Sequence, residues 1–187
     1  MKIQADKLSK AMASANVNLE QLAGAIVSPS LKPDRALSAL ANWLAGRDHP
    51  RAKADHVRRL AGALGVEAKD IVRFTSQVRH HRGSPRKARL VADLVRGKPV
   101  DQALNMLSFT TKRAAVNIKK ALNAAIADAE LAEADVTRLF VAESRVDEAP
   151  RIKRFHPKDR GRAHPIIKPL SHITIGVEEK PLKGARR

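Results

Sequence analysis

The chain has 187 residues and a formal net charge of +17 at pH 7, which predicts a polyanionic partner, either nucleic acid or an anionic membrane surface. The absence of cysteine excludes disulfides, thiolate metal sites and cysteine nucleophiles. Aromatic residues make up only 3% and tyrosine is missing, which disfavours a protein that reads RNA by stacking bases on exposed rings.

The membrane is the weaker of the two polyanionic candidates. No apolar run approaches the roughly 20 residues that cross a bilayer. The first twenty residues lack the apolar core of a signal peptide, because Asp6, Lys7 and Lys10 interrupt them. We therefore expect a cytoplasmic protein with no membrane partner.

Residues 1–74 are predicted to form an all-helical domain. Asn18 is placed to cap a helix over residues 19–27, and a loop over residues 28–33 ends it. Asp34 is placed to cap a second helix over residues 35–45. A third helix over residues 54–64 ends at Gly65.

This segment resembles the repressor-type helix-turn-helix family, which implies a DNA-binding regulator as an alternative function. The loop over residues 28–33 is longer than the tight turn of that family, and a helical bundle with similar leucine spacing remains the other interpretation. The residues that carry the resemblance are Leu19, Leu22, Ala23, Asn42, Trp43, Gly46, Pro50, Leu60, Ala61, Leu64, Gly65, Val66, Asp70 and Ile71.

A second domain is predicted over residues 75–180, beginning with a strand over residues 74–82. Ser84 and Pro85 are typical of a helix start, with a capping hydroxyl before a proline at the first helical position. Ala88, Val91, Ala92 and Val95 then fall on one face of that helix. A short helix follows over residues 100–107, and the longest helix starts near Thr111, with Ala114, Ala115, Ile118, Ala121, Leu122, Ala125 and Ile126 on one side.

A long β-hairpin is predicted over about residues 137–177. The segments around Val141 and Ile175 alternate in polarity with period two, which is typical of strands. Between them Pro157, Asp159 and Gly161 favour a chain reversal. The stretch over residues 150–170 carries the cations Arg151, Lys153, Arg154, Lys158, Arg160, Arg162 and Lys168.

This hairpin is too charged to stabilise itself. An isolated two-stranded ribbon is marginal in water, and the cations repel one another. Pro150, Pro165 and Pro169 each lack a backbone donor, so the distal half is expected to project as a free ribbon rather than to lie inside a sheet. A polyanion is the partner that supplies the missing stabilisation.

From about residue 75 to residue 179 the chain resembles the bacterial large-subunit ribosomal protein twenty-two family. The blocks that carry the resemblance are residues 84–98, 102–104, 119–122 and 124–127, and, in the hairpin, Phe140-Val141, Asp147-Glu148, Lys153-Arg154, Pro157, Gly161-Arg162-Ala163 and Ser171-His172-Ile173-Thr174. Ala149 stands where the family usually has glycine, and residues before about 75 are foreign to its pattern.

The resemblance implies an α+β fold, with a small sheet packed with three helices and a protruding hairpin after the all-helical N-terminal domain. It implies a structural role in the large ribosomal subunit and in subunit assembly. The implied partners are large-subunit ribosomal RNA (rRNA), neighbouring large-subunit proteins, and the nascent peptide in the exit tunnel. The hairpin tip expected to line that tunnel comprises Lys153, Arg154, Phe155, His156, Pro157, Lys158, Asp159, Arg160, Gly161, Arg162 and Ala163.

The residues predicted to bind rRNA are the basic side chains of both parts of this domain, since Lys and Arg neutralise phosphates. They are Arg79, His81, Arg82, Arg86, Lys87, Arg89, Arg96, Lys98, Lys112, Arg113, Lys120, Arg151, Lys153, Arg154, Lys158, Arg160, Arg162 and Lys168.

An enzyme is not expected, and neither is a metal or cofactor. The histidines at 80, 81, 156 and 164 lack the spacing of a known metal or catalytic motif, and the chain has no glycine-rich phosphate loop or nucleophile elbow. The basic tail over residues 181–187 is expected to be disordered in isolation. Whether residues 1–74 contact rRNA, a neighbouring protein or an assembly partner stays open.

Overall fold

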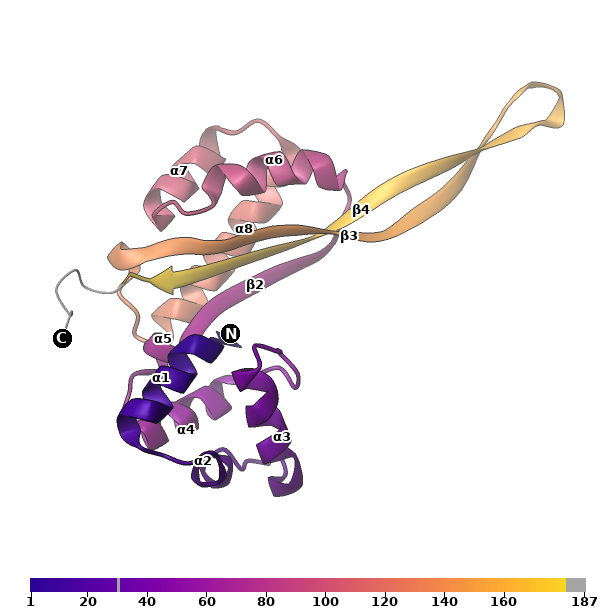
Figure 1. The fold of residues 1–187 in the computed structure, drawn as a ribbon. Coiled ribbons are helices and arrows are strands. Elements are labelled where there is room, and N and C mark those ends of the chain that lie inside the picture. Colours follow the sequence, from indigo (N-terminus) through magenta and orange to yellow (C-terminus); the bar gives the residue numbers. More distant parts are fainter. Residues whose placement is uncertain (30, 181–187) are drawn as a thin grey trace. The chain divides into compact units, whose positions relative to one another are not determined.

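The computed structural model describes residues 1–29 and 31–180, which places the predicted basic tail outside the described residues. Their helices and strands confirm the α+β class (Figure 1). The chain divides into two compact units. The first unit comprises residues 1–74 and 128–135, and the second unit comprises residues 75–127 and 136–180.

The elements follow one another in this order: β1 (Lys2–Ile3), α1 (Ala5–Ala15), α2 (Leu19–Ala25), α3 (Pro33–Leu44), α4 (Ala54–Leu64), α5 (Ala68–Ile71), β2 (Val72–His81), α6 (Pro85–Val95), α7 (Val100–Phe109), α8 (Arg113–Glu130), the 3₁₀ turn η1 (Val136–Arg138), β3 (Leu139–Pro157), the 3₁₀ turn η2 (Asp159–Gly161) and β4 (Ala163–Glu179).

Helices α1 to α5 of the first unit enclose an apolar core. Its largest fully buried side chains are Leu8, Leu22, Ile26, Leu40, Trp43, Leu60, Ile71 and Phe74. The indole Nε1 of Trp43 donates a hydrogen bond to the carbonyl of Pro50 at 2.7 Å, so this ring is buried without an unsatisfied donor.

Two predictions for the first unit are wrong. The segment is not all-helical, because β1 pairs antiparallel with the start of β2 through Lys2 opposite Arg73 and Ile3 opposite Val72. Asp34 is not the cap of α3 either. Helix α3 begins at Pro33, two residues before the predicted start, and its N-cap is Lys32. The first helical position suits proline because the missing N–H has no helical partner there.

Acid is expected to destabilise the first unit through His56. This buried imidazole lies 3.1 Å from the Ser28 hydroxyl, and its Nδ1 accepts a hydrogen bond from the backbone N–H of Lys53. Burial is the main cause that lowers the pKa of His56. The charge of Asp55 opposes this shift, and the charges of Lys53 and Arg59 add smaller lowering contributions. In the unfolded chain the His56 imidazole takes up a proton near pH 6.5, whereas in the folded unit it does so only at lower pH. The contribution of His56 to the stability of the first unit is therefore fully present above about pH 6.5, and it is lost as the pH decreases below that value.

Trp43, the single tryptophan of the chain, makes this measurable. Urea unfolding followed by its fluorescence should show a midpoint that falls as the pH is lowered from about 7.5 to about 5. The variant H56Q, which does not titrate in this range, should show a flatter dependence. Equal slopes in the parent and the variant would contradict the assignment.

The second unit is built on strands β2, β4 and β3, which are neighbours in that order. Helix α6 packs against β3 and β4, and α7 packs against α6 and β3. The buried residues of α6 include Ala88, Val91, Ala92 and Val95, which confirms the predicted apolar face. All seven residues predicted on one side of the longest helix are also buried, although α8 begins at Arg113 rather than near Thr111.

Ser84 stands at the predicted N-terminus of α6, but its side chain forms no capping hydrogen bond. The prediction is therefore right about the position of the helix and wrong about the hydroxyl. One consequence is that the first N–H groups of α6 are not satisfied by their own cap residue.

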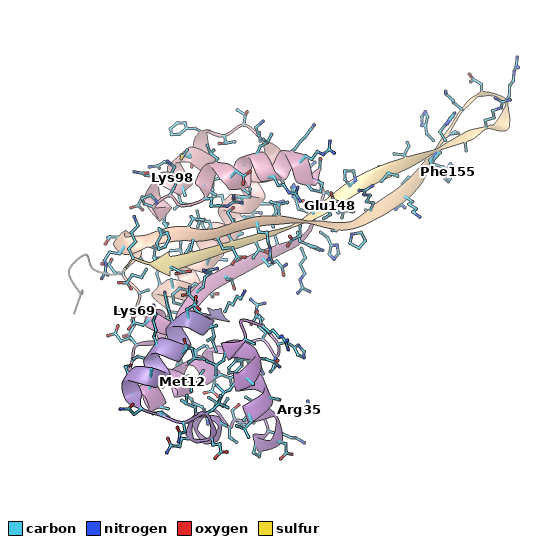
Figure 2. All side chains as sticks on the ribbon, in the orientation of Figure 1. Met12, Arg35, Lys69, Lys98, Glu148 and Phe155 are labelled. Carbon is cyan, nitrogen blue, oxygen red and sulfur yellow. The ribbon has the colours of Figure 1, made fainter. Side chains whose placement is uncertain are left out.

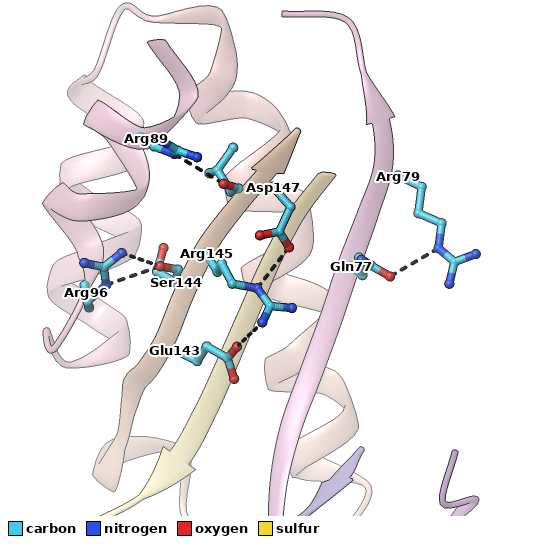
Figure 3. A network of polar contacts seen from close by, with 9 residues as sticks. Gln77, Arg79, Arg89, Arg96, Glu143, Ser144, Arg145 and Asp147 are labelled. Atoms are coloured by element: carbon cyan, nitrogen blue, oxygen red, sulfur yellow. Dashed lines mark hydrogen bonds and ion pairs between the residues drawn. The ribbon is translucent and has the colours of Figure 1, made fainter. Parts of the chain in front are cut away.

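Polar contacts join α6 to β3 around Ser144 (Figure 3). Arg96 donates two hydrogen bonds to the carbonyl of Ser144, at 3.2 Å from Nε and 2.5 Å from Nη2. The Ser144 hydroxyl donates to the carbonyl of Ala92 at 2.9 Å, and Arg89 Nε donates to the carbonyl of Val146 at 3.3 Å. These bonds fix the orientation of α6 on the sheet.

Strands β3 and β4 pair antiparallel from Leu139 opposite Glu179 to Pro157 opposite Ala163, with register shifts between Val141 and Glu143 and between Ala149 and Ile152. Figure 1 shows this ribbon extending well beyond the helices of the second unit. Its turn contains Arg160 and Gly161, both with left-handed backbone conformation (φ 59° and 73°). Glycine has no steric penalty at such a φ, which explains why it occupies the turn.

Candidate RNA-binding surface

The distal part of the ribbon leaves the core at a sharply defined point. Ala149 and Leu170 face each other and are both buried, with exposed fractions of 6%. Beyond this pair, residues 150–169 are exposed except for the half-buried Ile152. We call residues 150–169 the projecting hairpin. In the view of Figure 2 its side chains, among them the labelled Phe155, lie beyond the helices of the second unit.

An irregularity in the ladder marks the base of the projecting hairpin. Between Ala149 and Ile152, β3 has one more residue than the facing segment of β4. Such a bulge increases the twist of a ribbon and interrupts its pairing. Pro150, which has no backbone donor, lies within it, as the sequence leads one to expect.

Positive charge on the projecting hairpin is almost uncompensated. Its seven lysine and arginine residues are all exposed, and Asp159 is its only acid. Arg151 forms an ion pair with Glu148 at 3.3 Å, and Arg154 donates a hydrogen bond to the neighbouring carbonyl of Lys153. Within the described part of the chain, no other cation of the projecting hairpin has an ion-pair partner. These groups are therefore available to an external anion.

The register divides the projecting hairpin into two faces. Cross-strand pairs of one face are Lys153 with Ile167, Phe155 with Pro165, and Pro157 with Ala163. Pairs of the other face are Ile152 with Lys168, Arg154 with Ile166, and His156 with His164. The first face is mainly apolar and presents Phe155, whose ring is 75% exposed, whereas the second carries more charge and the histidines.

The predicted contacts outside the hairpin lie on several surfaces of the second unit. Arg82, Lys87, Lys112 and Arg113 come together around one pocket, between the end of β2 and the first turns of α6 and α8. Arg79, Arg86, Lys98 and Lys120 are exposed elsewhere on the unit. Arg89 and Arg96 are exposed too, but their guanidinium groups already donate to carbonyls of β3, so they have fewer donors left for a ligand.

His81 differs from every other predicted contact, because its side chain is only 6% exposed. Its Nδ1 lies 2.5 Å from the amide Nδ2 of Asn117 on α8. Burial, followed by the charge of Arg113, lowers the pKa of His81, so the ring is neutral at pH 7. The sequence did not single out Asn117 as a partner of this histidine, and no local pattern links two residues 36 positions apart.

Two further properties concern the described residues alone. None of the helices among residues 1–29 and 31–180 is long and apolar enough to cross a membrane. Over the same residues, no group of three or more histidine and acidic side chains is arranged to hold a metal ion.

The part of the chain that carries this surface matches a known family. The family model described as ribosomal protein L22p/L17e matches residues 76–178, which is more than half of the chain. The match includes the helices α6 to α8, the whole projecting hairpin and every predicted rRNA contact. It begins after the helices of the first unit, so the helix-turn-helix resemblance of residues 1–74 stays a prediction. On these grounds the chain belongs to the ribosomal protein L22p/L17e family.

Proposed function

We propose that this protein is a structural, non-catalytic constituent of the large ribosomal subunit that binds large-subunit rRNA. It would act on the ribosome in the cytoplasm, contact neighbouring ribosomal proteins and support subunit assembly. The observation that carries the proposal is the projecting hairpin, a ribbon without a core of its own whose cations are exposed and mostly unpaired. Membership of a large-subunit ribosomal protein family supports the same conclusion.

The physical mechanism is phosphate neutralisation. Each lysine or arginine that approaches a phosphate releases condensed counterions, and this release favours binding at low salt. Arginine adds specific geometry, because its planar group donates two parallel hydrogen bonds to phosphate and stacks on bases. RNA around the ribbon would also replace the packing that the projecting hairpin lacks, in the way that arginine-rich segments become ordered on RNA.

We further propose that the projecting hairpin extends along the nascent-peptide exit tunnel. Eight residue steps separate Ala149 from Pro157, so at roughly 3.3 Å per residue the ribbon reaches about 26 Å beyond its last buried pair. Such a reach suits a segment that passes between RNA walls. The two faces support a division of roles, with the charged face toward rRNA and the Phe155 face toward the tunnel interior.

Site-specific photocrosslinking in assembled ribosomes tests this function. A photoreactive phenylalanine analogue at Phe155 is expected to crosslink to a stalled nascent peptide, and the same analogue at Ile166 to rRNA. Leu37, which is 45% exposed in the first unit, provides a matched position outside the family segment. Crosslinks to rRNA from both hairpin positions, with none to the peptide, would contradict the tunnel assignment. If neither hairpin position crosslinks to rRNA, the function itself is contradicted.

A further inference from the structure

A pocket in the second unit has the chemistry of an anion site. It lies where the end of β2 meets the first turns of α6 and α8, and its volume is about 620 Å³. Four cationic side chains line it, namely Arg82, Lys87, Lys112 and Arg113, and no acidic residue does. Neither helix has an acidic residue in its first turn, the position where one would normally complement the helix dipole.

The two helices contribute backbone donors to the same place. The first N–H groups of a helix have no partner within the helix, and they attract anions together with the positive end of the dipole. In α6 the Ser84 side chain leaves them uncapped and Pro85 has no N–H, so the open donor among the residues that line the pocket is the N–H group of Lys87. In α8 the corresponding groups belong to Arg113 and Ala114.

A buried side chain provides a separate indication of a ligand. His81 lines the pocket although its ring is only 6% exposed. The amide nitrogen of Asn117 can only donate, so Nδ1 accepts and the neutral ring carries its proton on Nε2. Among the described residues, no partner is found for Nε2. This atom faces Gly83, where an added Cβ would lie only 2.6 Å away. The pocket therefore contains a positioned donor that has no use inside the protein.

We infer that this pocket binds one phosphate group of RNA through His81 Nε2–H, the open N–H groups of α6 and α8, and the surrounding cations. The inference rests on the proposed function and adds a specific site to it. The volume exceeds that of a single phosphate, and the exposed side chain of Leu90 on its wall provides an apolar surface for the attached sugar. Unlike the exposed cations of the projecting hairpin, this site fixes the phosphate in one orientation.

Titration of the isotopically labelled full chain with uridine monophosphate, followed by nuclear magnetic resonance, tests the inference. We expect saturable shifts of the backbone amides of Lys87, Arg113 and Ala114 and of the His81 Nε2–H. Inorganic phosphate should shift the same signals, and uridine, which has no phosphate, should not. Equal shifts with uridine, or shifts spread evenly over the exposed cations, would overturn the site.

Two variants make the test specific. In G83A the added methyl displaces the His81 ring, so the affinity for uridine monophosphate should fall at least tenfold while the other amide signals keep their positions. The double variant K87A/K112A should weaken binding as well. K10A/K32A removes the same charge from exposed sites of the first unit and should bind like the parent. Parent-like binding by G83A would overturn the inference.

Binding of a large-subunit rRNA fragment separates this inference from the proposed function. With K87A/K112A, the slope of log affinity against log salt should decrease by about 0.7 to 0.9, the value for one phosphate. An unchanged slope, with strong binding by the parent, would overturn the pocket and leave the function intact. If the parent does not bind the fragment at all, the function itself is refuted.

Discussion

Replacing residues 153–167 with Asn-Gly is expected to preserve the fold and to weaken rRNA binding strongly. The replacement joins Ile152 and Lys168, which already face each other, through a two-residue turn. Residues 153–167 are all exposed, so their removal takes little apolar surface out of the folded state. It removes the cations Lys153, Arg154, Lys158, Arg160 and Arg162. If each neutralises one phosphate, the slope of log affinity against log salt becomes shallower by about 4.

The measurement combines urea unfolding, followed by circular dichroism, with rRNA-fragment binding at several salt concentrations. A control variant keeps the hairpin at full length and carries K153Q, R154Q, K158Q, R160Q and R162Q. If charge dominates rRNA binding, the slope of log affinity against log salt should decrease as much in this variant as in the shortened one. Loss of helical signal in the shortened variant would show that the hairpin supports the fold. That result would contradict the expectation that removing exposed residues leaves the fold intact.

The variant W43A is expected to destabilise the first unit by about 3–5 kcal/mol without changing rRNA affinity by more than about twofold. Trp43 is 1% exposed, so its removal leaves a large cavity and an unsatisfied carbonyl at Pro50. All predicted rRNA contacts lie in the second unit, so an unfolded first unit should leave them in place.

Amide hydrogen exchange of the full chain measures the two units separately. The variant W43F retains most of the ring volume and loses only the hydrogen bond to Pro50, so a smaller loss of about 1–2 kcal/mol is expected. If the rRNA affinity of W43A instead falls together with the protection of the first unit, then residues 1–74 take part in RNA binding. That outcome would answer the question that the sequence leaves open.

Helix positions and buried faces were largely predictable because they depend on local patterns. The spacing of Ala88, Val91, Ala92 and Val95 identifies the buried face of α6 before any contact is known, since one helical turn brings these residues together. The limits of single elements were less predictable. The pairing of β1 with β2 depends on a partner that the local pattern does not contain. The start of α3 at Pro33 is different, because a proline at the first helical position is a local signal that the prediction missed.

The candidate site divides in the same way. Charge is a property of composition, so the cations of residues 150–170 and their need for a polyanion follow from the sequence alone. Their exposure on a projecting hairpin could be anticipated from proline positions, because a missing donor excludes a residue from the middle of a sheet.

Only the tertiary structure decided which basic residues act alone and which act together. It directs Arg89 and Arg96 to carbonyls of β3 and buries His81 against Asn117. It also gathers the starts of two helices around one pocket. A sequence pattern records whether a residue is charged and which face of its own element it occupies. The partner of a buried polar group is set by packing between segments that are distant in the sequence. A pattern within one helix or strand carries no information about which distant segment packs against it.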